Sequence, residues 1–451
     1  MRHRIPVLLL LLHSTLTFAQ VNPAASEKTK ILYNNLKIIQ QSNQFLFGQE
    51  FFNSFRYNSG GAHGDKETSD SKAVTGAHPA LLGSDFHYYL EKSDAERAFH
   101  TEAVKWAYQQ GYAITFDWHI SGRGTSTYEY RTESKDLVNN IVNNLNGDRD
   151  WLYTEFDKVI NILNNDLVMN GEPIPVVFRP WHEMNGGWFW WGSQATTPAG
   201  YKALYKLTVD YFKTRTTSVL FCWSPNSPTN FNYYPGDEYV DVLGLDAYEV
   251  TSSTLQTNLT PIVDYAQEHG KVAVLSETGN RTTNGDQAAS YWNNTVLPAI
   301  MQDPTGKLPK IAWVLTWINA SWSFAYVPHS GSSNAAKQSF IDFKNSPNVL
   351  FGDEIPNLYV PMDPPVAVNE STISSPRVDI YPVPAAEKLT IKITNMQLPA
   401  TVTLYNNLGQ ELDTLRVTRD TVVLDMARRG SVALIKVSDS TRVVSKRVIF
   451  K

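Results

Sequence analysis

The sequence predicts an α/β protein, a (β/α)8 TIM barrel followed by a small C-terminal all-β sandwich domain. Eight short apolar runs recur between residues 45 and 320, and segments with helical periodicity separate them. Residues 377–451 instead repeat short alternating runs, which predict strands at "VDIYPV", "KLTIKI", "TVTLYN", "TVVLDM", "VALIKV" and "VVSKRVIF", and they contain none of the chain's 12 tryptophans. We therefore expect two domains of different class within the 451 residues.

The eight apolar runs have the length of strands and are apolar on both faces, as is typical of parallel strands covered by helices. In chain order they are "FLFGQEF" from Phe45, "ALLGSDF" from Ala80, "YAITFDWHI" from Tyr112, "IPVVFRPWHE" from Ile174, "VLFCWSPN" from Val219, "VDVLGLDAY" from Val240, "VAVLSETG" from Val272 and "IAWVLTWINA" from Ile311.

Helices are expected between these runs, and the segment after Ser93 is an example. Ser93 and Glu96 have the spacing of a capping box, and Gly111 follows as a stop signal. Eight buried strands alternating with helices favour a closed barrel over an open doubly wound sheet. No glycine-rich phosphate-binding turn follows any of the runs.

Both ends of the barrel segment have distinct composition. Residues 1–19 carry Arg2, Arg4, an apolar run and small residues up to Ala19, which predicts a secretory signal peptide cleaved before Gln20. Residues 361–376, "PMDPPVAVNESTISSP", predict a linker between a main domain at 20–360 and the sandwich at 377–451. No stretch of about 20 apolar residues predicts a membrane span.

Charge is shared unevenly along the chain. Residues 377–451 hold 12 Lys/Arg and 7 Asp/Glu, whereas residues 20–376 hold 25 and 37. An acidic main domain argues against nucleic acid or an anionic membrane surface as its ligand. Cys222 is the only cysteine and lies in an apolar run, so we expect a buried thiol and no internal disulfide.

Polar or aromatic groups end all eight runs, at the rim where a barrel of this kind places reactive side chains. They are Glu50, Asp85, Asp117, His119, His182, Glu183, Asn226, Asp246, Tyr248, Glu277, Trp317 and Asn319. Glu183 on the fourth run and Glu277 on the seventh are the two glutamates that we expect to face each other. A carboxyl pair of this kind suits glycosidic bond cleavage, in which one acid donates a proton and the other carboxylate attacks or stabilises the anomeric carbon.

Four consecutive aromatics, Trp188 to Trp191, follow Glu183. They cannot all point inward, because successive side chains diverge, so we expect some of them in a sugar-binding groove. Apolar neighbours would also hinder ionisation of Glu183. The competing interpretation is structural: each glutamate could cap a helix or pair with an arginine, and the aromatics and His182 could belong to the core.

A metal site is the third interpretation, and the sequence disfavours it. The position four residues after His182, where a zinc-protease helix needs a second histidine, is Gly186. The ten histidines are scattered along the chain. We expect no metal and no cofactor.

The motifs "FRPWHEMNGGWFWWG", "LGLDAY", "LSETG" and "VLTWIN" resemble glycoside hydrolase family 26, best known for endo-β-1,4-mannanases, over about residues 28–350. The resemblance implies a retaining mechanism with Glu183 as acid/base and Glu277 as nucleophile. It also implies substrate-binding roles: His182 would orient the acid and contact sugar, Tyr248 would hydrogen-bond the nucleophile or the sugar, Trp317 would lie under the sugar at the cleaved bond, Trp188 would line the leaving-group side, and His119 would contact sugar.

The implied substrate is mannan, galactomannan or glucomannan. Members of the same family cleave mixed-linkage β-glucan or β-1,3-xylan, so these substrates remain the alternative. A non-catalytic polysaccharide-binding protein on the same barrel would be expected to lack one of the two glutamates, and both are present. Nothing in the sequence indicates an oligomer, so we expect a monomer.

The tail resembles the C-terminal sorting domain of the type IX secretion system in "DIYPVPAAEKLTIKI", "LYNNLGQEL" and the basic end "KRVIFK". This implies export through the periplasm of a Gram-negative bacterium, by the type IX machinery, to the cell surface or the medium. A carbohydrate-binding module is the rival interpretation of the tail, but without tryptophan it lacks the usual stacking surface.

Overall fold

The computed structural model describes residues 20–58, 65–281, 285–363, 377–381, 388–406, 408–425, 434–439 and 443–448. They fall into two compact units, one within residues 1–365 and the other within residues 366–451. The predicted signal peptide and residues 364–376 of the predicted linker lie outside the described residues. None of the described helices is both long and apolar enough to cross a membrane.

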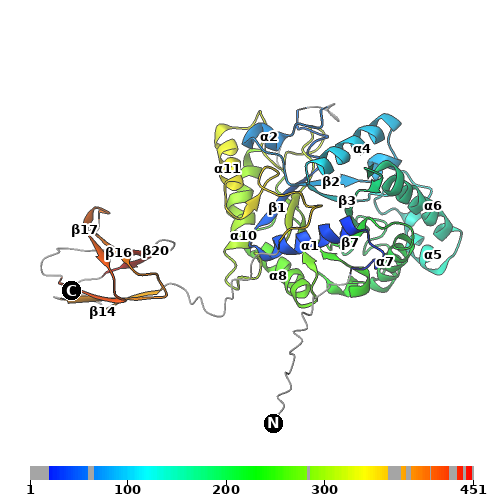
Figure 1. The fold of residues 1–451 in the computed structure, drawn as a ribbon. Helices are drawn as coiled ribbons and strands as arrows, with labels where there is room; N and C mark the ends of the chain where they lie inside the picture. The colour runs from blue at the N-terminus through cyan, green and yellow to red at the C-terminus, as the bar shows by residue number, and fades with distance from the viewer. Residues whose placement is uncertain are drawn as a thin grey trace, which may run out of the picture. The chain divides into compact units, whose positions relative to one another are not determined.

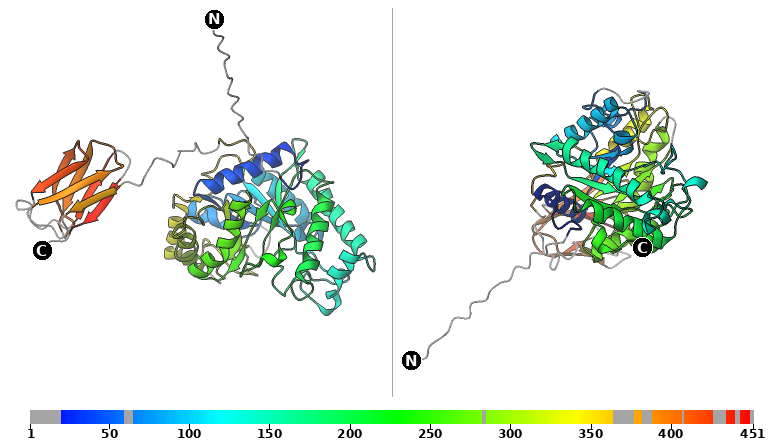
Figure 2. Two further views of the ribbon diagram at one scale, coloured as in Figure 1. Left: turned by 90° about the horizontal axis from the view of Figure 1, so that it is seen from below. Right: turned by 90° about the vertical axis from the view of Figure 1, so that its right-hand side faces the viewer.

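The first unit is the predicted barrel, with its helices on the outside of a closed parallel sheet (Figures 1 and 2). All eight predicted runs form strands. Their bounds are β1 (Phe45–Glu50), β2 (Leu81–Asp85), β3 (Ala113–Asp117), β6 (Val176–Arg179), β7 (Val219–Trp223), β8 (Val242–Leu243) with β9 (Asp246–Tyr248), β10 (Val272–Ala273) with β11 (Leu275–Gly279), and β12 (Trp313–Thr316). A short strand, β13 (Val349–Leu350), adds to β1.

The sheet closes because β1 pairs in parallel with both β2 and β12. The sixth and seventh strands are each split in two, which the sequence did not predict. At the split, the backbone N–H groups of Ser276 and Glu277 both donate to the carbonyl of Leu245, at 2.9 and 3.3 Å. This irregularity shifts the register between β11 and β12. Such a bulge re-aims the side chains beside it, here including Glu277.

Helices and helical turns connect the strands. The α-helices are α1 (Glu27–Gln41), α2 (Asp70–Thr75), α3 (His87–Leu90), α4 (Asp94–Gln109), α5 (Leu137–Asn143), α6 (Asp148–Asn161), α7 (Pro198–Phe212), α8 (Ser252–Glu268), α9 (Asp286–Tyr291), α10 (Leu297–Met301) and α11 (Asn334–Lys344). The predicted capping box of α4 is present, since Ser93 accepts from the Glu96 backbone and the Glu96 side chain accepts from Ser93. A two-residue hairpin, β4 (Val168–Met169) with β5 (Glu172–Pro173), precedes β6.

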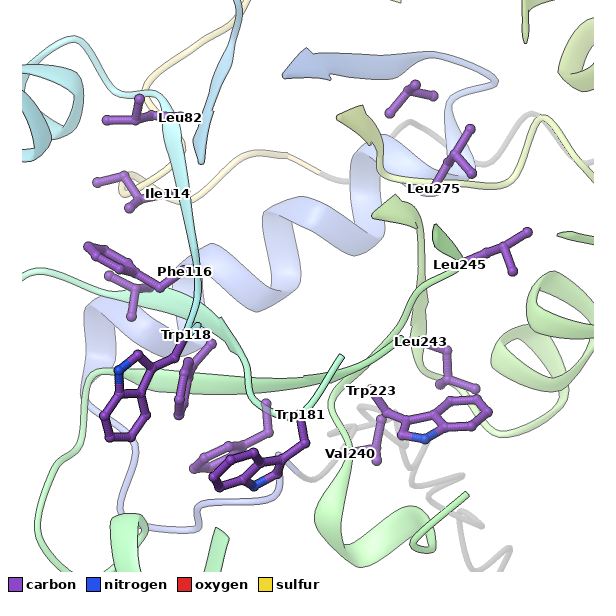
Figure 3. Close-up of a cluster of buried hydrophobic side chains, with 14 of the residues drawn as sticks. Leu82, Ile114, Phe116, Trp118, Trp181, Trp223, Val240, Leu243, Leu245 and Leu275 are labelled. Carbon is purple, nitrogen blue, oxygen red and sulfur yellow. The ribbon is translucent and has the colours of Figure 1, made fainter. Parts of the chain in front are cut away.

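Alternate residues of each strand belong to different parts of the core. In β7, Val219, Phe221 and Trp223 pack in the large cluster between the strands and the helices, part of which Figure 3 shows. Leu220 and Cys222 belong to a second cluster, which fills the barrel interior. This alternation explains why the runs are apolar throughout. Cys222 is buried, as predicted.

The same alternation places polar groups inside the upper end of the barrel. Ile114 and Phe116 of β3 face the helices, so Asp117 faces the barrel interior. By the same parity, Arg179 of β6 and Glu50 of β1 point inward. The chain therefore closes the C-terminal end of its barrel with buried charged groups instead of apolar ones.

The second unit is a small antiparallel β-structure with its own core. One sheet contains β14 (Arg377–Tyr381), β15 (Lys388–Thr394) and β18 (Thr421–Asp425), and the other contains β17 (Glu411–Val417), β16 (Ala400–Tyr405), β19 (Leu434–Ser438) and β20 (Val443–Arg447). Strand β17 was not predicted. It is an edge strand with Leu412 exposed, so it lacks the clear alternation of a half-buried strand.

Candidate active site

The C-terminal ends of the barrel strands open into a groove of about 580 Å³. All seven residues predicted from the sequence line it: His119, His182, Glu183, Trp188, Tyr248, Glu277 and Trp317. They come from the ends of β3, β6, β9, β11 and β12, which are far apart in the sequence. Other described residues on its wall include Tyr128, Phe189, Arg281, Phe324 and Tyr326.

Glu183 lies on a turn with an unusual backbone. Trp181 and Glu183 adopt the left-handed conformation, with φ of 56° and 54°. This conformation is costly for a residue with a side chain, so the surroundings must hold it. The backbone N–H of Glu183 donates to the carbonyl of Ser224, which directly follows β7. The carbonyl of Glu183 accepts from the N–H of Gly186. Both distances are 2.9 Å.

The aromatic run after Glu183 divides into structural and exposed residues. Phe189, Trp190 and Trp191 are buried, whereas Trp188 is 43% exposed. The indole N–H of Trp190 donates to the carbonyl of Ile120, and that of Trp191 donates to the carbonyl of His182, both over 2.9 Å. Of the four aromatics, Trp188 and Phe189 line the groove. Two of the buried ones hold the turn.

Glu183 is partly buried, and the indole N–H of Trp188 donates to its Oε2 over 2.8 Å. Burial raises the pKa of Glu183 well above its usual value, and the negative charge of Glu277 raises it further. The Trp188 hydrogen bond acts in the opposite direction but does not outweigh these effects. Glu183 is thus suited to carry a proton near neutral pH.

Glu277 has a different set of partners. Tyr248 donates from Oη to Oε2 over 2.6 Å, and the guanidinium of Arg179 donates to Oε1. Both donors hydrogen-bond the carboxyl oxygens of Glu277, and one of them is positively charged. The two glutamates therefore differ: Glu183 resides where the neutral form is favoured, and Glu277 is held by a cation and a phenol.

Arg179 connects the floor of the site. Its guanidinium also donates to Asp246 over 2.9 Å and contacts Asp117 over 3.4 Å. Burial and the charge of Glu277 raise the pKa of Asp246 to about 7, although Arg179 lowers it. Arg179 was not among the site residues predicted from the sequence. The sequence did contain a signal for it. An arginine at the end of an apolar run, at a position whose side chain points into the barrel, must pair with buried carboxylates.

Glu50 is a further buried acid beneath the groove. Among the described residues, neither of its carboxyl oxygens has a hydrogen-bond partner. Burial raises the pKa of Glu50 well above its usual value, and the charge of Glu277 adds to the effect. The side chain occupies space left by Gly83, where a Cβ would lie 2.2 Å from the carboxyl group. A neutral Glu50 does not compete for the positive charge of Arg179, which therefore acts on Glu277, Asp246 and Asp117.

The two predicted histidines lie side by side, with ring centroids 4.7 Å apart. His119 is held by Asp85, through Nδ1 to Oδ2 at 2.9 Å and through its backbone N–H. His182 is buried, and burial followed by the charge of Arg179 lowers its pKa well below the usual value. Within the described residues no hydrogen bond joins His182 to Glu183. The backbone carbonyl of His182 instead accepts from the indole N–H of Trp191, which holds the turn.

One ligand atom each of Asp117, His119 and His182 lies within 4.8 Å of the others, so these three residues could hold a metal ion. The premise that the histidines are scattered was wrong for this pair, because the barrel brings the ends of β3 and β6 together. Two of these three side chains already have other partners, however. His119 Nδ1 hydrogen-bonds Asp85, and Asp117 Oδ2 contacts Arg179.

Comparison with protein families gives two matches. Residues 21–320 match the model of glycosyl hydrolase family 26. Residues 379–451 match the model of a secretion system C-terminal sorting domain. The first match covers well over half of the chain and includes every predicted site residue.

Curated relatives are similar over the barrel. The chain is 27% identical over 327 residues to a mannan endo-1,4-beta-mannosidase of Bacillus subtilis strain 168, covering 68% of this chain and 84% of that protein. It is 25% identical over 392 residues to one of Bifidobacterium adolescentis, covering 75% of this chain but only 38% of that longer protein. A solved family 26 β-mannanase of Bacteroides ovatus superimposes with a TM-score of 0.66 at 29% identity, covering 74% of this chain and 98% of that one.

Proposed function

The chain belongs to glycosyl hydrolase family 26, and from this premise we propose that it is an endo-acting, retaining β-1,4-mannanase that cleaves mannan, galactomannan or glucomannan. Its C-terminal part is a secretion-system sorting domain, so the hydrolase is exported to the cell surface or the extracellular space. We assign hydrolysis to residues 20–360 and sorting to residues 377–451, joined by residues 361–376, and we expect the enzyme to act as a monomer.

The observation that carries the mechanism is the unequal environment of the two glutamates. Glu183, with its raised pKa, donates a proton to the leaving glycosidic oxygen. Glu277, hydrogen-bonded by Tyr248 and Arg179, attacks the anomeric carbon as a carboxylate. The C–O bond to the leaving sugar breaks, and a covalent glycosyl ester forms on Glu277.

In the second step Glu183, now ionised, takes a proton from water as the water attacks the anomeric carbon. The ester bond to Glu277 breaks, and the product keeps the configuration of the substrate. Arg179 and Tyr248 stabilise Glu277 as the leaving carboxylate. These donors are already in place before the substrate binds, so little reorganisation accompanies the charge change.

The substrate-binding residues follow from the same arrangement. Trp188 is exposed beside Glu183, so its ring suits a sugar on the leaving-group side. Trp317 lines the groove with its ring centroid 5.7 Å from that of His119, which suits a platform under the sugar at the cleaved bond. His119 and His182 bring imidazole groups to the same wall, where sugar hydroxyls need hydrogen-bond partners.

The relatives named above support mannan as the substrate, and mixed-linkage β-glucan and β-1,3-xylan are the alternatives. A reducing-sugar assay on galactomannan, glucomannan, lichenan, β-1,3-xylan and cellulose, with product sizes resolved, tests the proposal. Short manno-oligosaccharides from the first two substrates are the expected result. Hydrolysis confined to lichenan or xylan would contradict the mannan assignment, and hydrolysis of none would favour a non-catalytic polysaccharide-binding protein.

A further inference from the structure

The loop after β12 carries two exposed aromatic residues, Trp322 and Phe324, which are 57% and 37% exposed. In the described part of the barrel unit, the only other large hydrophobic residues that are as open to solvent are Trp188, Leu145 and Val360. Trp188 and Phe324 both line the groove, and Trp322 is two residues from Phe324. Exposed aromatic rings at the edge of a groove mark a binding surface more often than chance exposure does.

The loop is held in shape by Asn319. The Asn319 side chain donates to Asp70 Oδ2 and to the carbonyl of Val327, at 2.9 and 3.0 Å, and it accepts from the N–H groups of Tyr326 and Val327. Across the loop, the N–H of Ala320 donates to the carbonyl of Phe324 over 3.3 Å. A turn closed in this way presents residue 322 at its tip without needing a ligand to order it, which lowers the entropy cost of binding.

The ring of Trp322 is supported from one side. It packs edge-to-face against Phe55, with centroids 6.0 Å apart and planes at 86°. Phe55 in turn packs on Phe51 and Tyr88. Ile318 and Ala320 complete this cluster, and Trp317 packs against it. The cluster fixes the Trp322 ring relative to Trp317 and leaves more than half of the residue open to solvent.

Trp322 is on the side of the barrel opposite Trp188. Trp188 follows β6, the fourth of the eight strands, and Trp322 follows β12, the eighth, so four strand positions separate them around the closed sheet. Trp188 is hydrogen-bonded to Glu183, the proton donor, and therefore flanks the leaving group. A polysaccharide that crosses the groove from Trp188 over Trp317 continues toward Trp322. This is the glycone side, which stays bound when the leaving group departs.

We propose that Trp322 forms a distal sugar-binding subsite, in which its exposed indole face stacks on a hexopyranose ring of the bound polysaccharide on the glycone side, beyond the ring over Trp317. This rests on the proposed function, because the direction of the chain is set by the role of Glu183. The flat face of β-1,4-linked mannose or glucose presents axial C–H groups to an aromatic ring, and the polar edge stays hydrated. Phe324 adds a second aromatic side chain of the same loop to the wall of the groove.

The test uses the full-length protein and 4-nitrophenyl β-manno-oligosaccharides of two to five sugars. Release of 4-nitrophenol reports only those complexes in which every sugar occupies the glycone side. For Trp322→Ala we expect kcat/KM to be unchanged on the shortest substrate and to fall about fivefold to tenfold once the chain is long enough to reach the ring. Trp322→Tyr, which keeps an aromatic face, should recover most of the loss. Leu145→Ala, which removes an exposed apolar side chain that does not line the groove, should behave as wild type at every length.

An equal loss at every chain length, or no loss at any length, would overturn the inference. Loss that appears only with natural oligosaccharides extended on the leaving-group side would also overturn it, because Trp322 would then lie on the other side. A dimer that dissociates in Trp322→Ala, measured by sedimentation, would assign the ring to a second copy of the chain instead.

A binding measurement separates this inference from the hydrolysis mechanism. In a Glu277→Ala background, migration through gels containing galactomannan, lichenan or xylan reports affinity without turnover. The retarding polysaccharide identifies the substrate class, and adding Trp322→Ala should reduce that retardation. If the wild-type protein cleaves none of the panel, the proposed function fails. In this measurement the subsite fails, independently of hydrolysis, if Trp322→Ala leaves retardation unchanged on every polysaccharide.

Discussion

Tyr248 donates a hydrogen bond from its Oη to Oε2 of Glu277 over 2.6 Å, while the other oxygen of the same carboxylate accepts from Arg179. Among the residues that the structure describes, the hydrogen-bond donor to the Glu183 carboxyl group is the neutral indole N–H of Trp188. The local partners of the two glutamates therefore support the roles proposed for them, without reference to any relative. The pKa of Glu183 is raised by burial, whereas Glu277 is hydrogen-bonded by a guanidinium and a phenol.

Alanine at the two glutamates should give different phenotypes. Glu183→Ala should lower kcat about 10²- to 10⁴-fold on polysaccharide, because the leaving oxygen is no longer protonated. It should retain activity on aryl glycosides whose leaving groups need no proton, and added azide should accelerate turnover by attacking the glycosyl-enzyme. Glu277→Ala should be inactive on both substrate types. Equal, modest losses in steady-state assays of the two variants would refute the role assignment.

Tyr248→Phe should lower kcat/KM about tenfold to a hundredfold, because Glu277 loses one of its two charge-stabilising donors. Tyr211→Phe is the matched control, since Tyr211 also donates to a carboxylate, that of Asp157, but lies outside the groove. Steady-state kinetics on a soluble oligosaccharide measures both. If the two variants lose the same activity, the Tyr248 hydrogen bond has no specific role in catalysis.

Trp188→Phe should move the alkaline limb of the pH profile of kcat/KM to higher pH. The Trp188 hydrogen bond lowers the pKa of Glu183, so its removal leaves burial and the charge of Glu277 less opposed and raises that pKa further. The active form carries the proton, so activity persists to higher pH. Trp151→Phe, on helix α6 outside the groove, should leave the limb in place. A limb that stays or moves to lower pH in Trp188→Phe would contradict the assignment of Glu183 as the acid.

Glu50→Gln should reduce the pH dependence of stability. The pKa of Glu50 is raised in the folded state, so the folded protein binds a proton that the unfolded chain releases, and stability falls as pH rises through the interval between the two pKa values. Glutamine cannot ionise, so the variant does not lose stability in this way as pH rises. Between pH 5 and 8, the Tm of wild type should fall more than that of Glu50→Gln, whereas Glu102→Gln, which removes an exposed acid, should parallel wild type. Parallel curves for all three would show that Glu50 is ionised in the fold.

The sequence predicted the barrel because its eight strands are short, apolar and followed by polar residues. It also predicted the groove, since a closed parallel sheet brings all strand ends to one rim. The partners of each site residue were not predictable in the same way. That Arg179 contacts Glu277 depends on inward parity at the end of β6 and on the bulge in β11, and a run of apolar letters does not reveal a bulge.

The aromatic run shows a related limit. Four adjacent aromatics predict that not all can be buried, but which one is exposed depends on the left-handed turn at Trp181 and Glu183. Asparagine and glycine often signal such a turn, whereas tryptophan and glutamate do not. In the tail, the missed strand β17 has an exposed edge and so lacks the alternation that a half-buried strand shows.

Covalent labelling of Glu277 tests the central claim most directly. A 2-deoxy-2-fluoro manno-oligosaccharyl fluoride slows both chemical steps, but its good leaving group allows the glycosyl-enzyme to form and accumulate. Mass spectrometry of the digested protein should find the sugar on the peptide that contains Glu277. A label on Glu183, or an unlabelled protein that releases product of inverted configuration, would contradict the account.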